Sequence, residues 1–413
     1  METVIPPEQA SFFLRLVLNY IVKTRVSYDK AFRSIIGRYR FPRWIISTLY
    51  KLGYNAVNYY YTLRWLSAKH GYGSRPGGIV NFFASIGFSI RRALLVAEEE
   101  ARKLATSKRL SITYSYPEYL IRDLLRHITS EELEKMLESL NTRKRWLRIN
   151  TARATFSEAL KCLEKTGIVY EVVKQPHYAV MVKEPLWKPI GRNKCVIQGM
   201  VVPQDISSIL AVESMKPIKG LLLDACSAPG LKLSLAFMIS KDIDKCVAID
   251  ASARRLNTEY RLLHALGAPL HRITLIRADA SSTTFNTVFD LALVDAPCSG
   301  LGAVYSDPAV KLNSPSRRKL YYYHNLQYRI LMNTLRHARR VVYTTCSIHP
   351  LEGEAVVERI VSDGYADPIK ISNPLLSSAY PGYSISKQTY RVMPHLVNGQ
   401  GFYIAVLESK VVG

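Results

Sequence analysis

The stretch Gly220-Leu-Leu-Leu-Asp-Ala-Cys-Ser-Ala-Pro-Gly-Leu-Lys232 decides the fold of the larger part of this chain. An apolar run ends in an acid, and a turn of small residues then leads into an apolar segment with helical character at 231–239. This order predicts a buried strand, a tight loop and a helix. In open α/β sheets ligands bind at the carboxyl ends of the strands, where small residues let the backbone approach a ligand closely. The stretch therefore predicts a ligand-binding loop.

The alternation of strand and helix continues downstream. We expect strands at 246–250, 273–277, 289–294 and 341–345, helices at 252–266, 316–338 and 352–362, and two antiparallel edge strands at 390–392 and 402–408. Strands that alternate with helices are typical of a doubly wound parallel sheet, an α/β fold.

Acids follow three of these strands, at Asp224, Asp250 and Asp279. Each alone is more often a helix cap or a turn residue, but a carboxylate at Asp250 can accept both hydroxyls of a ribose, and Asp279 can lie near an adenine. The loop after Asp224 has neither the G-x-G-x-x-G spacing nor a Walker lysine, which argues against dinucleotides and nucleoside triphosphates. The three acids together predict a nucleoside-type cofactor.

Two cysteines also follow apolar strands, in Asp295-Ala-Pro-Cys-Ser-Gly300 and in Thr344-Thr-Cys-Ser347. A free cysteine is most often a buried structural residue. Here both lie in polar loops at the ligand edge of the sheet, so Cys298 and Cys346 are candidate catalytic thiols.

Composition limits the possible functions. The 413 residues are 48% apolar and 22% charged, as in a globular protein of two or three domains. Six cysteines without a C-x-x-C pair predict neither a metal site nor a disulfide scaffold, so we expect a reducing, cytoplasmic location. The longest apolar stretch, 79–90, is shorter than the roughly 20 residues of a membrane span, and the N-terminus does not resemble a signal peptide. We expect a monomer without a membrane partner.

Positive charge points to a polyanionic partner. The formal net charge is +23, and residues 1–92 hold 14 Lys and Arg against 3 Asp and Glu, a net +11. Tyrosines interleave with these basic residues, as in Tyr59-Tyr-Tyr61 before Arg64. Two interpretations stay open for this helical segment: a bundle with a solvated basic face, or an RNA-binding module whose rings stack on nucleobases.

The loop motifs resemble those of the Sun (Fmu) family of RNA cytosine-5 methyltransferases, over about residues 112–410. The pair of D-x-P-C-S-G and T-C-S motifs on successive strands is the most specific part of the likeness. The other matching positions are 224–232, Asp250, Arg255, Asp279, Arg391, Pro394, His395 and 401–402, with 146–150 and 201–205 upstream. Two departures are Gly230-Leu-Lys-Leu233, where the family usually has Gly-Gly-Lys-Thr or Gly-Asn-Lys-Thr, and 306–312, which lacks the usual aromatic residue.

The resemblance implies three domains. Residues 1–111 would form a basic helical RNA-binding domain similar to the NusB-like appendage of the bacterial ribosomal branch. Residues 112–195 would form a small α+β subdomain similar to an RNA-recognition fold. Residues 196–413 would form a Rossmann-like class I methyltransferase domain that uses S-adenosyl-L-methionine. The implied activity is formation of 5-methylcytosine in rRNA or tRNA through a covalent cysteine–cytosine adduct.

The resemblance also implies roles for single residues. Cys346 would be the nucleophile, Cys298 would assist release of the product, Asp295 would bind the cytosine edge, and Lys232 would lower the pKa of a thiol. The implied cofactor-binding residues are Cys226, Ser227, Ala228, Pro229, Gly230, Leu231, Lys232, Asp250, Arg255, Asp279 and Asp295.

Two alternatives remain. One is a catalytically inactive RNA-binding scaffold that keeps the methyltransferase fold. The other is a methyltransferase for DNA or protein. The N/D-P-P-Y signature of amino-group methylases is absent, and DNA cytosine methylases attack with the Pro-Cys motif and lack the second cysteine motif, so RNA is favoured.

Overall fold

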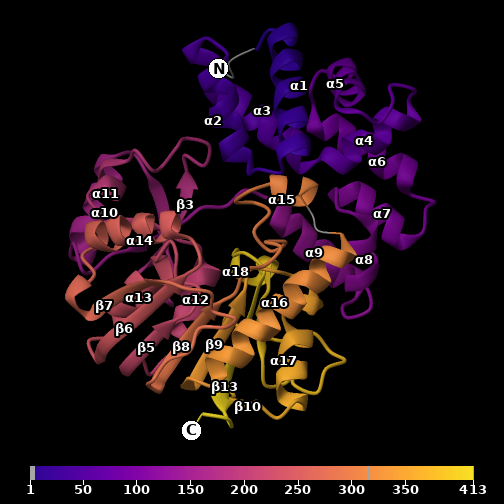
Figure 1. Cartoon of the computed structure of the whole chain (residues 1–413). Helices are drawn as coiled ribbons and strands as arrows, with labels where there is room; N and C mark the ends of the chain where they lie inside the picture. The colour runs from indigo at the N-terminus through magenta and orange to yellow at the C-terminus, as the bar shows by residue number, and fades with distance from the viewer. Residues whose placement is uncertain (1–4, 314–315, 413) are drawn as a thin grey trace. The chain divides into compact units, whose positions relative to one another are not determined.

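The computed structural model describes residues 5–313 and 316–412 (Figure 1). They form two compact units. The first contains the described residues up to Arg143 together with 303–313, and the second contains 144–302 and 316–412. The domain boundaries at 111/112 and 195/196 remain predictions.

The first unit is helical. Its helices are α1 (Pro7–Thr24), α2 (Tyr28–Arg38), α3 (Ile46–Asn58), α4 (Tyr60–Lys69), α5 (Pro76–Ser85), α6 (Ile90–Ala101), α7 (Thr106–Tyr114), α8 (Glu118–Leu124), α9 (Ser130–Asn141) and the short α15 (Ala309–Leu312). Serine hydroxyls accept first-turn amides at two of the starts, Ser27 before α2 and Ser89 before α6. No single helix among the described residues has the length and apolar character to cross a membrane, although α5 and α6 meet that test as a pair bent by 99°.

Several tyrosines of this unit belong to its core. Tyr28 and Tyr54 are buried and form edge contacts with their ring centroids 6.0 Å apart. Tyr60 is buried, and its neighbours Tyr59 and Tyr61 are half-buried. Burial raises the pKa of all three of these phenols, at 59, 60 and 61. For this run, core packing therefore describes the rings better than stacking on nucleobases.

Residues 303–313 follow the first cysteine motif in sequence yet pack among the N-terminal helices. Lys311 is fully buried there, and its Nζ donates to the carbonyls of Asn58 (2.8 Å) and Tyr114 (3.0 Å) and to Oδ1 of Asn141 (2.6 Å). The ammonium also lies 4.1 Å from the centroid of the Tyr116 ring. Burial lowers the pKa of this lysine well below its usual value. The segment without the usual aromatic residue is therefore anchored by a lysine.

The second unit begins with a small antiparallel sheet of order β2-β3-β1-β4. Its strands are β1 (Trp146–Ile149), β2 (Val169–Val172), β3 (Ala179–Glu184) and β4 (Val201–Pro203), with α10 (Phe156–Lys165) and α11 (Lys194–Ile197). A capping box between Thr155 and Glu158 starts α10. The expectation of reduced cysteines needs one correction, because Cys162 of α10 and Cys195 of α11 form a disulfide. The two cysteines are 33 positions apart in the sequence and meet where α10 packs against α11. Their spacing in the sequence does not predict this contact.

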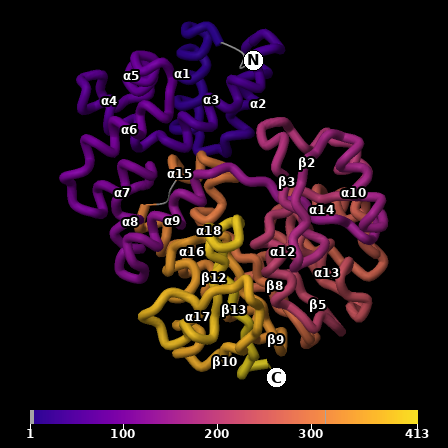
Figure 2. The backbone as a smooth tube through the Cα atoms, turned by 180° about the vertical axis from the view of Figure 1, so that it is seen from behind, coloured from indigo at the N-terminus to yellow at the C-terminus, as the bar shows by residue number. Residues whose placement is uncertain are grey.

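The large sheet has the order β11-β12-β13-β9-β8-β5-β6-β7, and β10 pairs with β13 (Figure 1). The strands are β5 (Gly220–Asp224), β6 (Ile243–Asp250), β7 (Ile273–Arg277), β8 (Phe289–Asp295), β9 (Ala338–Thr345), β10 (Ala366–Pro368), β11 (Ser377–Ser378), β12 (Tyr390–Val392) and β13 (Phe402–Ser409). Strands β5 to β9 are parallel to one another, whereas β12 and β13 are antiparallel, as expected. Figure 2 shows this antiparallel end in yellow.

Both faces of the large sheet are covered. Along β8, Leu291 and Leu293 point to one core, and Ala292 and Val294 point to the other. The first core contains side chains of α12 (Ile206–Glu213), α13 (Leu231–Ile239) and α14 (Ala253–Leu266). The second contains side chains of α16 (Arg317–Leu335) and α17 (Glu354–Ser362). Coverage on both sides explains the continuous apolar runs that predicted these strands.

Candidate active site

The loop between β5 and α13 is tied to its neighbouring strands. The backbone amide of Ala225 donates to Leu293 (2.9 Å), and that of Ser227 donates to Ile249 (3.0 Å). Gly230 has a φ of 90° and precedes the first residue of α13. A Cβ there would lie 2.9 Å from Cγ of Glu259, so the position requires glycine both for its conformation and for space.

Glu259 supports this loop from α14, and sequence reasoning missed it. Its side chain is fully buried, and Oε2 accepts the hydroxyl of Ser227 at 2.8 Å. Burial, with a smaller contribution from the charge of Asp250, raises its pKa from 4.5 to about 7. The available signal was an acid on the apolar stripe of a helix, between Leu256 and Leu263.

The acids at the ends of β6 and β7 have different partners. Asp250 pairs with Arg255 (2.9 Å), whose guanidinium also donates to the carbonyl of Ala228. The arginine thus links Asp250 to the loop, although more than half of its side chain is exposed. Asp279 accepts the backbone amide (2.9 Å) and the hydroxyl (2.8 Å) of Ser281, and these bonds hold its pKa below the usual value. Asp279 therefore acts as a turn residue through its Oδ1.

Asp224, at the end of β5, is buried, and its Oδ1 has no hydrogen-bond partner among the described residues. Burial and the nearby charges of Glu259 and Asp295 raise its pKa well above the usual value. A buried carboxylate oxygen beside a loop that requires glycine fits a polar ligand with donor groups. A nucleoside-containing cofactor such as S-adenosylmethionine has such groups.

Lys232, in the first turn of α13, pairs with Asp295 at the end of β8 (Nζ–Oδ2 2.5 Å). Its Nζ also lies 5.5 Å from the centroid of the Phe402 ring. The partner of the lysine in this structure is therefore a carboxylate rather than a thiol. Cys226 is no candidate nucleophile, because burial and the charge of Asp224 raise the pKa of its thiol well above the usual value.

The two candidate thiols lie in contact, with Sγ of Cys298 3.1 Å from Sγ of Cys346. Both side chains are half-buried. The amide of Gly302 donates to the carbonyl of Cys346 (2.9 Å), and a Cβ at Gly302 would lie 1.8 Å from the carbonyl oxygen of Gly401. The hydrogen bond to Cys346 and burial raise the pKa of Cys298 well above its usual value, so Cys298 is a thiol at neutral pH. A protonated thiol in contact with a second sulfur is suited to proton donation.

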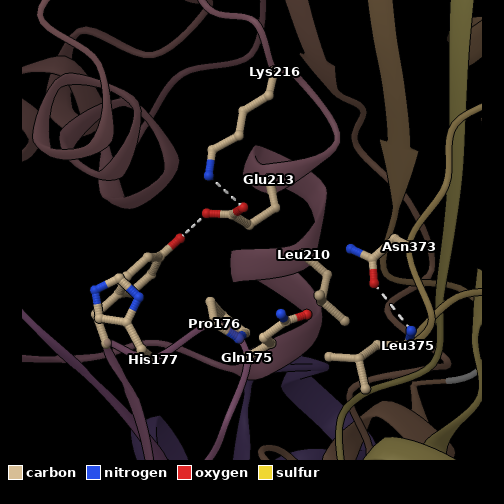
Figure 3. A pocket seen from close by; sticks show the side chains of 9 residues that line it. Gln175, Pro176, His177, Leu210, Glu213, Lys216, Asn373 and Leu375 are labelled. Atoms are coloured by element: carbon tan, nitrogen blue, oxygen red, sulfur yellow. Dashed lines mark hydrogen bonds and ion pairs between the residues drawn. The ribbon is translucent and has the colours of Figure 1, made fainter.

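A cavity of about 310 Å³ lies elsewhere in this unit, lined by Pro176, His177, Leu210, Glu213 and Asn373 among others. Glu213 already accepts the hydroxyl of Tyr178 and pairs with Lys216 (2.6 Å), which Figure 3 shows pointing toward it. None of the site residues expected from the sequence lines this cavity. In the part of the chain that the structure describes, no three His, Cys, Asp or Glu side chains gather to hold a metal ion.

Two family models match the chain. Residues 213–408 match the 16S rRNA methyltransferase RsmB/F family, and residues 116–187 match the ferredoxin-like domain of RsmF/B-like methyltransferases. The first match contains every site residue described above, and the second overlaps the small antiparallel sheet.

Three curated relatives illustrate the likeness. The chain is 30% identical over 295 residues to "26S rRNA (cytosine-C(5))-methyltransferase nsun-5" of Caenorhabditis elegans, covering 64% of this chain and 67% of that protein. It is 30% identical over 319 residues to "28S rRNA (cytosine(4447)-C(5))-methyltransferase" of Homo sapiens, covering 72% of this chain but only 38% of the human protein. It is 29% identical over 223 residues to "tRNA (cytosine(49)-C(5))-methyltransferase" of Pyrococcus abyssi, covering 51% and 71%.

A solved structure supports the fold. The crystal structure of the protein PH0851 superposes with a TM-score of 0.79 at 19% identity, covering 99% of this chain and 100% of the other. The expected Rossmann-like methyltransferase core, small antiparallel subdomain and N-terminal helices are confirmed. The expected enzyme class and S-adenosylmethionine dependence are confirmed at the level of the family. With two thiols in contact at the ends of β8 and β9, and with these matches, the chain belongs to the RsmB/F (Sun/Fmu) family of S-adenosylmethionine-dependent RNA cytosine-C5 methyltransferases.

Proposed function

We propose that this protein methylates carbon 5 of a cytosine in rRNA or tRNA, with Cys346 as the nucleophile and Cys298 as the thiol that assists product release. The observation that supports these roles best is the 3.1 Å contact between the two sulfurs at the carboxyl edge of the sheet. The loops that carry these cysteines follow the neighbouring parallel strands β8 and β9, so both sulfurs lie at the ligand edge of the sheet.

The chemistry explains why a nucleophile is needed. Carbon 5 of cytosine is a weak nucleophile until a thiolate adds to carbon 6, which interrupts the conjugation of the ring and makes carbon 5 electron-rich. The sulfur of Cys346 forms the C–S bond. Asp295, the last residue of β8, is proposed to accept a hydrogen bond from the cytosine edge, and Lys232 holds its carboxylate in position.

The cofactor-binding residues proposed from the sequence include the loop itself, at 226–232, and the Asp250–Arg255 pair, which is bonded to the carbonyl of Ala228 in that loop. When bound, S-adenosylmethionine supplies an electrophilic methyl group, which carbon 5 accepts. The loop provides backbone groups, and Asp250 provides a carboxylate that Arg255 orients. Asp279 accepts both hydrogen bonds from Ser281 at Oδ1, which leaves Oδ2 for the cofactor.

The last step restores the aromatic ring. A base removes the hydrogen on carbon 5, the C–S bond breaks, and its electron pair returns to the sulfur of Cys346. Cys298 is protonated and in contact with that sulfur, so it can donate a proton to the departing thiolate. The target base must leave its stack to reach the cysteines, at a cost of roughly a few kcal/mol.

The relatives named above act on rRNA in two cases and on tRNA in one, so both RNA classes are candidates for this chain. The monomeric state and the cytoplasmic location expected from the sequence stay predictions.

Transfer of a labelled methyl group from S-adenosylmethionine to RNA tests the proposal. Replacement of Cys346 by alanine removes the attacking atom, so product formation is expected to fall by at least about 10³-fold, with cofactor affinity by calorimetry unchanged. Full activity of Cys346→Ala would refute the nucleophile assignment. A wild-type protein that binds RNA but neither binds the cofactor nor transfers methyl would instead support the inactive scaffold.

A further inference from the structure

One buried carboxylate, that of Glu352, contacts the residues that follow both cysteines. Glu352 ends a 3-10 turn (Pro350–Glu352) after the second cysteine motif, and its side chain is fully buried. Ser299 follows Cys298 and Ser347 follows Cys346 in the chain. Neither the cysteine motifs nor the roles proposed above use this acid.

Each oxygen of the carboxylate has two donors. Oε1 accepts the backbone amide of Ser299 (2.7 Å) and the side-chain amide of Gln327 (3.4 Å). Oε2 accepts the hydroxyl of Ser347 (2.6 Å) and that of Ser299. An ionised carboxylate offers about four acceptor positions, and all four are used here. The two serine hydroxyls lie 3.2 Å apart as a result.

Glu352 is itself fixed by the surrounding sheet and helix. Its backbone carbonyl accepts the hydroxyls of Tyr343 (2.9 Å) and Thr345 (3.0 Å) from β9. Gln327 of α16 also donates to the carbonyl of Pro297, beside Cys298, at 2.9 Å. The carboxylate is therefore a rigid point between β9, α16 and the first cysteine loop.

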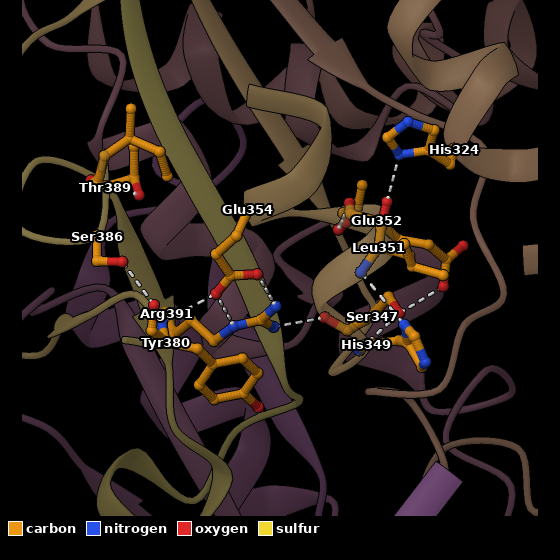
Figure 4. A network of polar contacts seen from close by, with 12 residues as sticks. His324, Ser347, His349, Leu351, Glu352, Glu354, Tyr380, Ser386, Thr389 and Arg391 are labelled. Atoms are coloured by element: carbon orange, nitrogen blue, oxygen red, sulfur yellow. Dashed lines mark hydrogen bonds and ion pairs between the residues drawn. The ribbon is translucent and has the colours of Figure 1, made fainter. Parts of the chain in front are cut away.

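A second tether fixes the other side of Ser347. Arg391 donates to its carbonyl (2.8 Å) and forms a fully buried pair with Glu354 (2.6 Å), as Figure 4 shows. Charge-assisted bonds of this kind are the stronger ones inside a protein. The Arg391 pair holds only the Cys346 loop, whereas Glu352 holds both loops.

We propose that Glu352 is a positioning residue that keeps the thiols of Cys298 and Cys346 in contact by binding Ser299 and Ser347 at once. This inference rests on the catalytic roles proposed above for the two cysteines. Its negative charge has a second consequence, because it contributes to keeping Cys298 protonated. One side chain thus holds the loops of both cysteines.

The rate of disulfide formation between Cys298 and Cys346 measures their contact without any need for catalysis. The oxidant diamide accepts two electrons and two protons from a thiol pair, and peptide mapping identifies the product. The wild-type protein is expected to form this disulfide rapidly, because the sulfurs are 3.1 Å apart. Glu352→Gln places an amide against the donors of Ser299, so the rate is expected to fall at least 10-fold.

Glu358→Gln is the matched control. Glu358 lies in α17, and its carboxylate likewise accepts a backbone amide (3.2 Å) and a hydroxyl (3.0 Å) from one serine, Ser384, in a loop without cysteine. Its disulfide rate is expected to equal that of the wild type. Equal rates for Glu352→Gln and the wild type would overturn the inference, and so would an equal loss in Glu358→Gln.

Activity provides an independent readout. In Glu352→Gln, kcat for methyl transfer is expected to fall 10- to 100-fold, with KM for RNA within 2-fold of the wild type. A KM effect without a kcat effect would contradict a positioning role. If Glu352→Gln does not fold, the double variant Ser299→Ala and Ser347→Ala removes the two hydroxyl donors and leaves the acid in place, and the same loss of disulfide rate is expected. An active Cys346→Ala variant would refute the catalytic roles of the cysteines but would not change the disulfide rates of the wild type and Glu352→Gln. Failure of the proposed function and failure of the positioning role are therefore distinguishable.

Discussion

The proposed chemistry gives different roles to two cysteines that lie in contact. The hydrogen bond of Cys298 to Cys346 and burial, with smaller contributions from the charges of Cys346 and Glu352, raise the pKa of Cys298 and favour its protonated form. A protonated thiol cannot attack carbon 6 but can return a proton. The environment of Cys298 therefore suits the release step rather than the attack.

Glu259, which supports the cofactor loop, makes the stability of the folded protein depend on pH. Its pKa is raised from 4.5 to about 7 in the folded protein, so the folded state holds this proton between these values while the unfolded state has lost it. Stability therefore declines as pH rises from 4.5 to 7 and is level above that. Relative to Glu259→Gln, which cannot ionise, the wild type is expected to lose on the order of 3 kcal/mol of unfolding free energy over this range.

Urea unfolding of both proteins at pH 4.5, 6 and 7.5 measures this difference. If the difference in unfolding free energy between the wild type and Glu259→Gln does not change with pH, Glu259 has an ordinary pKa in the folded state and the prediction is wrong.

Single residues were predicted from the sequence where they follow an apolar strand directly. Cys298, Cys346, Asp250 and Asp295 all stand within three residues of a strand end, and the parallel sheet brings these ends together. Glu259 and Glu352 were missed for a physical reason. Their roles depend on serines 32 and 53 positions away, Ser227 and Ser299, and such pairings follow from tertiary packing and not from local pattern.

The junction of the cofactor loop with α13 is the element that tolerates least change. Gly230→Ala forces a side chain into positive φ and against Glu259. The substitution is expected to weaken cofactor binding at least 10-fold and to destabilise the fold by about 1–3 kcal/mol. Calorimetric titration with S-adenosylmethionine and thermal unfolding measure the two effects.

Gly364→Ala provides the comparison for that substitution. Gly364 has a φ of 78°, but a Cβ there would meet no atom within 4 Å. Gly364→Ala has the same cost of a positive φ as Gly230→Ala but not the clash with a neighbouring side chain. Its affinity for the cofactor is therefore expected to equal that of the wild type. Equal affinities for the two variants would contradict the role assigned to the loop geometry.

Elements were predictable where burial on two faces produced long apolar runs. Strands β5, β6, β8 and β9 have such runs, and their order of appearance with helices predicted the doubly wound sheet. Strands β3 and β4 of the small sheet were not expected, because one is interrupted by charge at its end and the other has three residues. The packing of 303–313 among the N-terminal helices was also not foreseen, since a buried lysine, Lys311, reads as a surface residue in sequence.

At the scale of the whole molecule, the net charge of +23 sets the salt dependence of RNA binding. Contacts between phosphates and basic side chains release counterions, so affinity falls steeply with salt. A loss of roughly 10³-fold in RNA affinity is expected between 50 and 200 mM salt, as for about six or more phosphate contacts. Fluorescence anisotropy with a labelled RNA across this range measures the slope, and a flat response would contradict an electrostatic RNA surface.

The central claim, that Cys346 forms a reversible bond with cytosine, is tested most directly by stopping the reaction after attack. The variant Cys298→Ala lacks the proposed release thiol, and it is incubated with RNA and S-adenosylmethionine, denatured and mapped by mass spectrometry. The account predicts a denaturant-resistant RNA–protein complex with the cytidine on Cys346, and no complex when both cysteines are replaced. A cytidine attached to any other residue, or no covalent complex from an active preparation, would contradict it.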